Sequence, residues 1–228
     1  MERTSQRMVK YEEELMLLNK KLLEMASLVE FMIAKSIKAL REGNMILAQE
    51  VIRTDDQVNA MEVDIDNLCI KILALYQPEA TDLRTVTMIM KINNDLERIG
   101  DHASSISRMA LFMADYPPIK PLVDIPKMAD KAIEMLREAL DAFIKNDEQL
   151  AIEVCRKDDE VDNYEPQIVR ELVTFMMSDP STLNRALRYL YVARHLERVA
   201  DLATNIAENA YYIATGEMLK HQHTSEVN

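Results

Sequence analysis

Apolar residues recur every three or four positions over long stretches of the chain. The first stretch runs from Leu15 to Leu40 and is followed by Gly43. This spacing predicts an amphipathic helix, because residues three and four positions apart share one helical face. Gly43 is placed where a glycine commonly ends a helix. The same period predicts a second helix at Met45–Tyr76 and, after a short turn, a third helix that reaches about Met113.

A proline-rich segment divides the chain near its middle. Pro117, Pro118 and Pro121 fall within five positions. Proline cannot continue a helix, so this segment is predicted to be a linker. Beyond it the apolar period returns and predicts helices at about 125–145, 147–177 and 181–215.

These patterns predict an all-α protein of six helices, arranged as two tandem three-helix bundles. The chain has 228 residues and three glycines, a composition that favours long helices. Short connections make neighbouring helices antiparallel. The predicted units are 1–115 and 122–216, and residues 217–228 are predicted to form a flexible tail.

The second half of the chain repeats the first. Residues 96–106 match residues 196–206 at an offset of 100, with six of eleven positions identical. Residues 53–62 match residues 156–165 at an offset of 103, with five of ten identical. The shared residues include charged ones, which packing alone does not require. The sequence therefore predicts an internal duplication that also carried a function.

Each repeat carries acidic and amide side chains on its second and third helices, at spacings of three and four. Such positions share a helical face, so the two stripes can converge if the helices are neighbours. In the first unit the candidates are Asp55, Asn59, Glu62, Glu97 and Asp101. In the second unit they are Asp158, Asp162, Glu165, Glu197, Asp201 and Asn205.

Clustered carboxylates repel one another, and sets of oxygen ligands suit hard cations such as Mg²⁺, Mn²⁺, Ca²⁺ or iron. We therefore expect cation binding at these residues. The alternative is a solvated face with salt bridges, since Arg98 and Arg198 follow the glutamate of each motif. Pro166 lies within the predicted fifth helix and should kink or restart it, which leaves the geometry of Glu165 open.

Composition excludes several functions. The three glycines lie too far apart for a P-loop or a dinucleotide-binding turn, and no Gly-x-Ser-x-Gly motif is present. No histidine follows a glutamate at the Glu-x-x-His spacing of di-iron bundles. His102 and His195 occupy unrelated repeat positions, so surface or salt-bridged roles are expected for them.

The charge and the termini point to a compartment and to classes of partner. The chain has 27 basic and 39 acidic residues, a net charge of −12, which disfavours binding to nucleic acid. The N-terminus lacks the apolar region of a secretory signal, and no uncharged apolar run approaches 18 residues. We expect a cytoplasmic protein with reduced cysteines.

Two segments resemble one known family. The segments MEVDIDNLCIKILALYQPEATDLRTVTMIMKINNDLERIGDHA and HLERVADLATNIAENAYYI resemble the PhoU family, the accessory proteins of phosphate-specific transport systems. The resemblance implies a cytoplasmic homodimer without catalysis that represses phosphate uptake and the phosphate-starvation response. It implies the transporter ATPase subunit PstB and the sensor kinase PhoR as partners, and contact with the membrane only through them.

The resemblance also implies a multinuclear cluster of Fe, Mn, Mg or Zn on the acidic motifs. In the first unit Ser105 stands where Asn205 stands in the second, so the two sites are expected to differ. A metal-dependent phosphohydrolase and a metal-binding scaffold remain the alternatives. The phosphate biology follows from the resemblance and not from the periodicity.

Overall fold

The computed structural model describes residues 2–117, 119 and 124–219, and these residues form helices and their connections without a β-strand. Pro118, Pro121 and the tail from residue 220 lie outside the described residues. The helices are α1 (Glu2–Glu42), α2 (Met45–Tyr76), α3 (Ala80–Met113), α4 (Asp124–Lys145), α5 (Glu148–Asp162), α6 (Tyr164–Ser178), the 3₁₀ turn η1 (Pro180–Thr182) and α7 (Leu183–Thr215).

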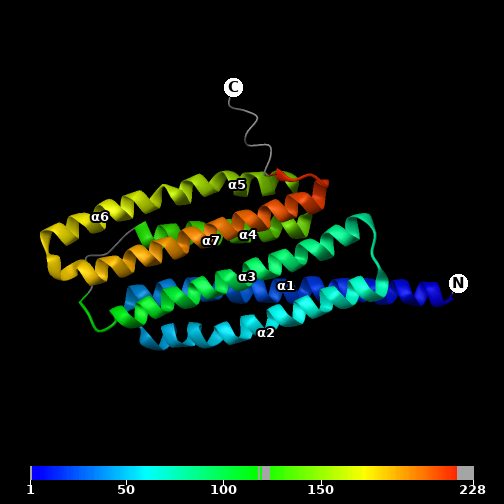
Figure 1. The fold of residues 1–228 in the computed structure, drawn as a ribbon, viewed down its shortest axis with the longest axis horizontal. Helices are drawn as coiled ribbons and strands as arrows, with labels where there is room; N and C mark the ends of the chain where they lie inside the picture. Colours follow the sequence, from blue (N-terminus) through cyan, green and yellow to red (C-terminus); the bar gives the residue numbers. More distant parts are fainter. Residues whose placement is uncertain (1, 118, 120–123, 220–228) are drawn as a thin grey trace, which may run out of the picture.

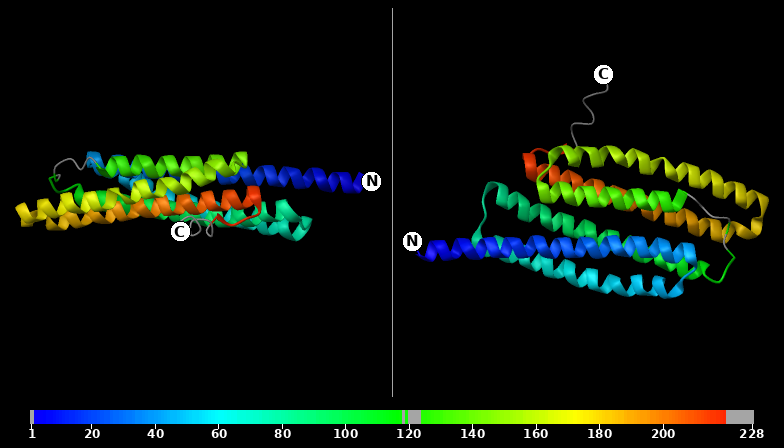
Figure 2. Two further views of the ribbon diagram at one scale, coloured as in Figure 1. Left: turned by 90° about the horizontal axis from the view of Figure 1, so that it is seen from above. Right: turned by 180° about the vertical axis from the view of Figure 1, so that it is seen from behind.

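The helices form two antiparallel three-rod bundles placed side by side (Figure 1). The first bundle holds α1, α2 and α3; the second holds α4, α7 and the rod in which α5 and α6 continue one another. This arrangement confirms the predicted all-α, duplicated fold. The N-terminal part of α1 projects beyond its neighbours (Figure 2).

The first turn of each unit shows the duplication in backbone detail. Gly43 and Asn146 both adopt a left-handed conformation, with φ of 62° and 50°. The next residues, Asn44 and Asp147, cap the following helices, and their side chains accept hydrogen bonds from backbone N–H groups. Gly43 and Asn146 are 103 positions apart, and so are Asn44 and Asp147, so the repeat includes this turn.

The predicted fifth helix is interrupted. α5 ends at Asp162, Asn163 joins the segments, and α6 begins at Tyr164. Pro166 has no N–H to donate to the carbonyl of Asp162, so an unbroken helix would lose that bond. Within the first turn of α6 the missing N–H costs nothing, because the N–H groups there have no partner within the helix. The expected restart at Pro166 is therefore present.

One continuous apolar core joins the two units. Nearly all buried apolar side chains of the helices form one large cluster that extends across both bundles, and Ala39, Ala48 and Ala110 form a small separate one. α3 packs along α7, and α1 contacts α4. An ion pair between Glu30 and Arg137 Nε, at 2.6 Å, also joins α1 to α4. The units are therefore held by shared burial, and their relative position is fixed by packing.

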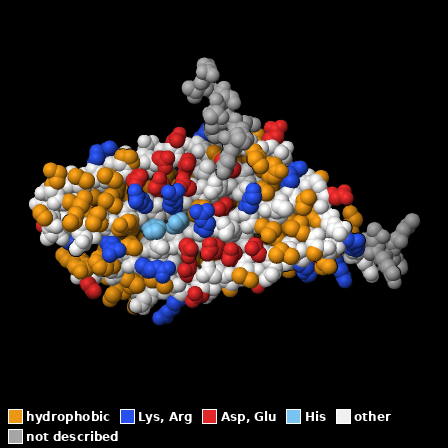
Figure 3. Space-filling view, viewed as in Figure 1, with side chains coloured by type: hydrophobic (Ala, Val, Ile, Leu, Met, Phe, Trp, Pro, Cys, Tyr) orange, Lys and Arg blue, Asp and Glu red, His pale blue; other side chains and the backbone are white. Residues whose placement is uncertain are grey.

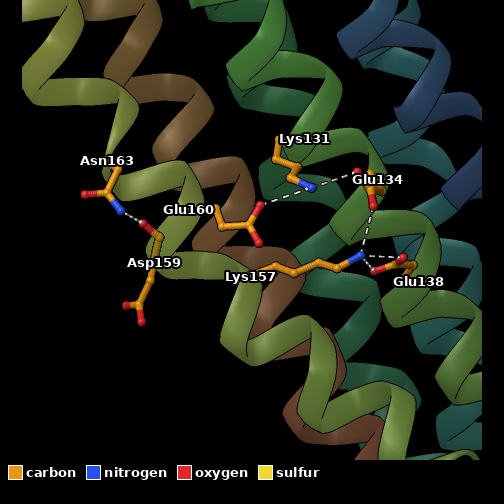
Figure 4. Close-up of polar contacts among 7 residues, drawn as sticks. All are labelled: Lys131, Glu134, Glu138, Lys157, Asp159, Glu160 and Asn163. Carbon is orange, nitrogen blue, oxygen red and sulfur yellow. Dashed lines mark hydrogen bonds and ion pairs between the residues drawn. The ribbon is translucent and has the colours of Figure 1, made fainter.

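The outer surfaces of the two copies have diverged. On the second unit, Lys157 of α5 bonds Glu134 and Glu138 of α4, while Lys131 joins Glu134 to Glu160 (Figure 4). In the first unit, the positions equivalent to Glu134 and Glu138 are Phe31 and Lys35. Lys35 Nζ lies 4.1 Å from the centroid of the Phe31 ring, in a cation–π contact. The repeat therefore did not preserve this surface.

The left-handed residue after α1 gives a direct test of the turn. Replacing glycine in this conformation by a residue with a Cβ lowers the free energy of unfolding by about 1 kcal/mol, and asparagine is tolerated better than most other residues. We expect Gly43→Ala to lower Tm by about 2–4 °C and Gly43→Asn to lower it by less than half as much. Thermal unfolding followed by circular dichroism measures both. Equal losses in the two variants would contradict the role assigned to backbone conformation.

Candidate functional site

The first acidic face lies where α2 packs beside α3. The pKa of Glu97 on α3 is raised, first by burial and then by the negative charges of Asp101, Glu62 and Asp55. The pKa of Asp55 is raised by burial and by Asp101. Residues from two helices, far apart in sequence, therefore share one patch. Asn59 is exposed on the same stretch of α2.

The second acidic face repeats this arrangement on α5, α6 and α7. Burial, followed by the charges of Asp162 and Asp201, raises the pKa of Asp158 to about 6. The pKa of Glu197 is raised by burial and then by Glu165 and Asp201. Asp162, at the end of α5, also has a raised pKa, through burial and Asp201. The convergence expected from the helical spacing is therefore present in both units.

A buried carboxylate oxygen marks the same place in each unit. The Oδ1 atoms of Asp55 and Asp158 are inaccessible to solvent and have no hydrogen-bond partner. The hydroxyls of Ser104 and Thr204 lie near these carboxylates and lower their pKa values against the effect of burial, but neither reaches Oδ1 in hydrogen-bonding geometry. An unpaired buried carboxylate oxygen is costly, and a bound cation would offset that cost.

Ser104 and Thr204 were not selected from the sequence. They occupy equivalent positions in the matched segments 96–106 and 196–206, and both carry a hydroxyl. That shared chemistry was the available signal. The spacing of charged residues does not point to these positions, because a hydroxyl carries no charge.

The two faces differ in their neutralising groups. On the second face Arg198 Nη1 lies 2.9 Å from Asp201, and Arg194 Nε lies 3.8 Å from Glu165. On the first face Arg98 pairs instead with Asp95, at 3.8 Å. The bridging arginines make the second face partly a salt-bridged surface, which was the alternative considered from sequence. Asn205 is half-buried on α7 beside this face.

The acidic side chains share patches without closing around a point. Among the residues that the structure describes, no three His, Cys, Asp or Glu side chains gather closely enough to hold one ion. The donor chemistry nevertheless fits a hard cation, because each face combines carboxylates from two packed helices with one buried unpaired oxygen. Side-chain rotations would be needed to bring the carboxylates onto an ion.

The two faces lie on the same side of the molecule. Figure 3 shows two groups of acidic side chains separated by basic residues and by two adjoining histidines. The histidines are His102 of α3 and His195 of α7, and they contact each other. Burial, and next the neighbouring imidazole, lower the pKa of His102 to about 4. Both are half-buried at this surface and contact each other, a pairing that the expected surface or salt-bridged roles did not include.

The duplicated acidic faces coincide with a known domain. The sequence model of the PhoU domain matches residues 22–110 and again residues 125–210. The chain belongs to the PhoU family. A protein of Aquifex aeolicus called phosphate-specific transport system accessory protein PhoU homolog is 45% identical over 204 residues, 90% of this chain and 92% of that protein. The PhoU accessory protein of Edwardsiella tarda is 38% identical over 92% of this chain and 87% of its own.

Solved PhoU structures share the fold. The crystal structure of PhoU from Pseudomonas aeruginosa superposes with a TM-score of 0.87 at 40% identity, covering 91% of this chain and all of that chain (100%). The regulatory protein PhoU from Streptococcus pneumoniae gives 0.84 at 31% identity, over 92% and 99% of the two chains. The PhoU-family fold is thus established over nearly the whole chain. No helix among the described residues is both long enough and apolar enough to cross a membrane.

The raised pKa of Asp158 predicts how stability changes with pH in metal-free protein. Its pKa is about 6 when folded and 3.8 ordinarily, so the folded state binds the proton more tightly. The resulting stability is fully present below pH 4 and is lost as the pH rises through 6. At pH 7 we expect Asp158→Asn to be more stable than the parent by about 1 kcal/mol, after allowance for solvent screening.

Denaturant unfolding in a chelator at pH 4, 5.5 and 7 measures this difference. The gap between variant and parent should close toward pH 4. Asp130→Asn, which alters an exposed carboxylate of α4, serves as the matched control and should show no such gap. A gap that stays constant with pH would contradict the assignment to Asp158.

Proposed function

We propose that this protein is a negative regulator of phosphate uptake and of the phosphate-starvation response, and that it acts through protein–protein contacts. Membership of the PhoU family carries this proposal, since the relatives are named accessory proteins of phosphate-specific transport systems. The regulator works without catalysing a reaction. Its partners are the transporter ATPase subunit PstB and the sensor kinase PhoR.

The shape and charge of the molecule suit such a role. Two groups of acidic side chains are exposed on one side of the molecule (Figure 3), and long helices carry them. A net charge of −12 favours basic partner surfaces over nucleic acid or anionic lipid. The protein is cytoplasmic in this proposal, works as a homodimer, and reaches the membrane only through its partners.

Metal ions belong to the proposal as organisers of the acidic faces. Asp55, Asn59, Glu62, Glu97 and Asp101 would hold them on the first face. On the second face the ligands would be Asp158, Asp162, Glu165, Glu197, Asp201 and Asn205. Bound Fe, Mn, Mg or Zn would supply positive charge that cancels carboxylate repulsion and fixes the spacing of the helices. The unpaired oxygens of Asp55 and Asp158 support this assignment.

Deletion of the gene, combined with a reporter for phosphate-starvation genes, tests the regulatory role. In phosphate-rich medium the deletion strain should express the reporter constitutively, and the intact gene should restore repression. Affinity capture with the tagged protein should recover PstB and PhoR. Normal repression in the deletion strain would refute the proposal.

Paired glutamate substitutions test the metal assignment. Glu97→Gln and Glu197→Gln remove one carboxylate charge from each face and preserve side-chain size. We expect the double variant to retain less Mn or Fe after purification than the parent, because each face loses a ligand. Glu24→Gln, on an exposed ion pair of α1, is the matched control.

Elemental analysis at physiological metal concentrations gives the readout. Each single variant should lose ions from its own face. Glu97→Gln should lose more metal than Glu197→Gln, because arginines already pair with carboxylates of the second face. Equal metal content in the parent and the double variant would contradict the assignment.

A further inference from the structure

The packing of α3 against α7 brings together two histidines that the repeat does not relate. The Nδ1 atoms of His102 and His195 lie 3.1 Å apart. The ring centroids are 5.2 Å apart, so the Nδ1 edges of the rings face each other. Both side chains are half-buried at a surface that lies between the acidic groups (Figure 3). The pair therefore combines a fixed geometry with access from solvent.

The facing nitrogens place a constraint on protons. A hydrogen bond at this distance needs one Nδ1 that carries a proton and one that offers a lone pair. If both rings carry their proton on Nε2, two lone pairs face each other and repel. A cation between the rings removes that repulsion, and neutral imidazole is the form of histidine that binds metals.

The separation of the nitrogens matches that of two ligands on one ion. Zinc–nitrogen bonds are about 2.0–2.1 Å long. Two such bonds at angles between square-planar and tetrahedral place the nitrogens about 2.9–3.4 Å apart. The observed 3.1 Å falls within this range, so the pair can chelate an ion without changing its separation.

We propose that His102 and His195 form a chelate for one borderline divalent ion, Zn²⁺, Ni²⁺ or Cu²⁺, with water completing the coordination. Imidazole nitrogen suits these ions, whereas carboxylate and carbonyl oxygens suit harder ones. The site is therefore separate from the acidic faces in its residues, and its preferred ions overlap with those proposed for the faces only in zinc. It stands whether or not the proposed regulatory function is correct.

The surrounding charges do not prevent binding. Arg98 and Arg198 oppose a cation, whereas Asp101 favours one. The arginine side chains are 52% and 62% exposed, so solvent and salt screen them. Each also lies beside a carboxylate, Asp95 for the first and Asp201 for the second. The whole chain is strongly acidic, which raises the local concentration of cations.

An ion at this place would act on both units at once. His102 belongs to the first unit and His195 to the second, so the chelate would cross-link α3 to α7. Because the two nitrogens meet only in the folded chain, the ion stabilises the folded state. It would also hold the two acidic faces at a fixed separation.

Calorimetric titration of the full chain with Ni²⁺, and separately with Zn²⁺, tests the proposal. The reference protein in these titrations is the full chain with His221→Gln and His223→Gln, because these two histidines could chelate ions on their own. It is called the parent below. We expect one Ni²⁺ per chain, and a Tm about 5 °C higher or more when Ni²⁺ is a hundredfold above its Kd. His102→Gln and His195→Gln should each weaken Ni²⁺ binding at least about tenfold and reduce the rise in Tm by about half or more.

Two controls separate this site from the acidic faces. The Glu97→Gln and Glu197→Gln double variant should bind Ni²⁺ as the parent does. The histidine variants should retain Mn²⁺ as the parent does. Ni²⁺ titration of the parent, followed by proton NMR, needs no histidine variant at 102 or 195 and should broaden the ring signals of both residues.

Three results would overturn the proposal. The first is undiminished Ni²⁺ binding in the His102→Gln, His195→Gln double variant. The second is loss of Ni²⁺ binding in the glutamate variant with the histidines intact. The third is Ni²⁺ that leaves both ring signals unbroadened. If the deletion strain repressed the phosphate-starvation reporter normally, the proposed function would fail, but the Ni²⁺ titrations would still test the histidine site.

Discussion

The burial of α3 against α7 determines most other features of the molecule. These two helices form the third rod of each unit, and their apolar faces belong to one core that extends through both bundles. Burial of apolar area is the dominant favourable term in folding, so two units that share a core have one preferred relative position. That position decides which polar residues of different units meet, including His102 and His195.

Placing acidic residues between packed helices has an energetic cost. Burial and mutual repulsion raise the pKa values of Asp55, Glu97, Asp158 and Glu197. A structure selected for stability alone would replace them, because neutral or ion-paired side chains fit such places better. Their presence at equivalent positions in both copies is the physical reason to connect them with a cation and with function.

The two copies have since diverged in ways that affect the acidic faces. Pro166 interrupts the rod that carries the second face, whereas α2 runs unbroken beneath the first. Arginines pair with Asp201 and Glu165 on the second face, but Arg98 pairs away from the first face, with Asp95. One copy therefore presents carboxylates that are free of ion pairs with arginine among the described contacts. Duplication supplied two similar faces, and later changes made them unequal.

The helices, their ends and the acidic stripes could be predicted from local patterns in the sequence. Apolar periodicity, Gly43 and Pro166 act locally, so helix boundaries such as Met45–Tyr76 could be predicted from neighbouring residues. The spacing of Glu97 and Asp101 likewise fixes their common face. The burial of Asp55 Oδ1 without a partner, the contact of Arg194 with Glu165 and the meeting of the two histidines became visible only in the folded chain. These features depend on how helices distant in sequence pack, and local spacing contains no information about the angle and depth of that packing.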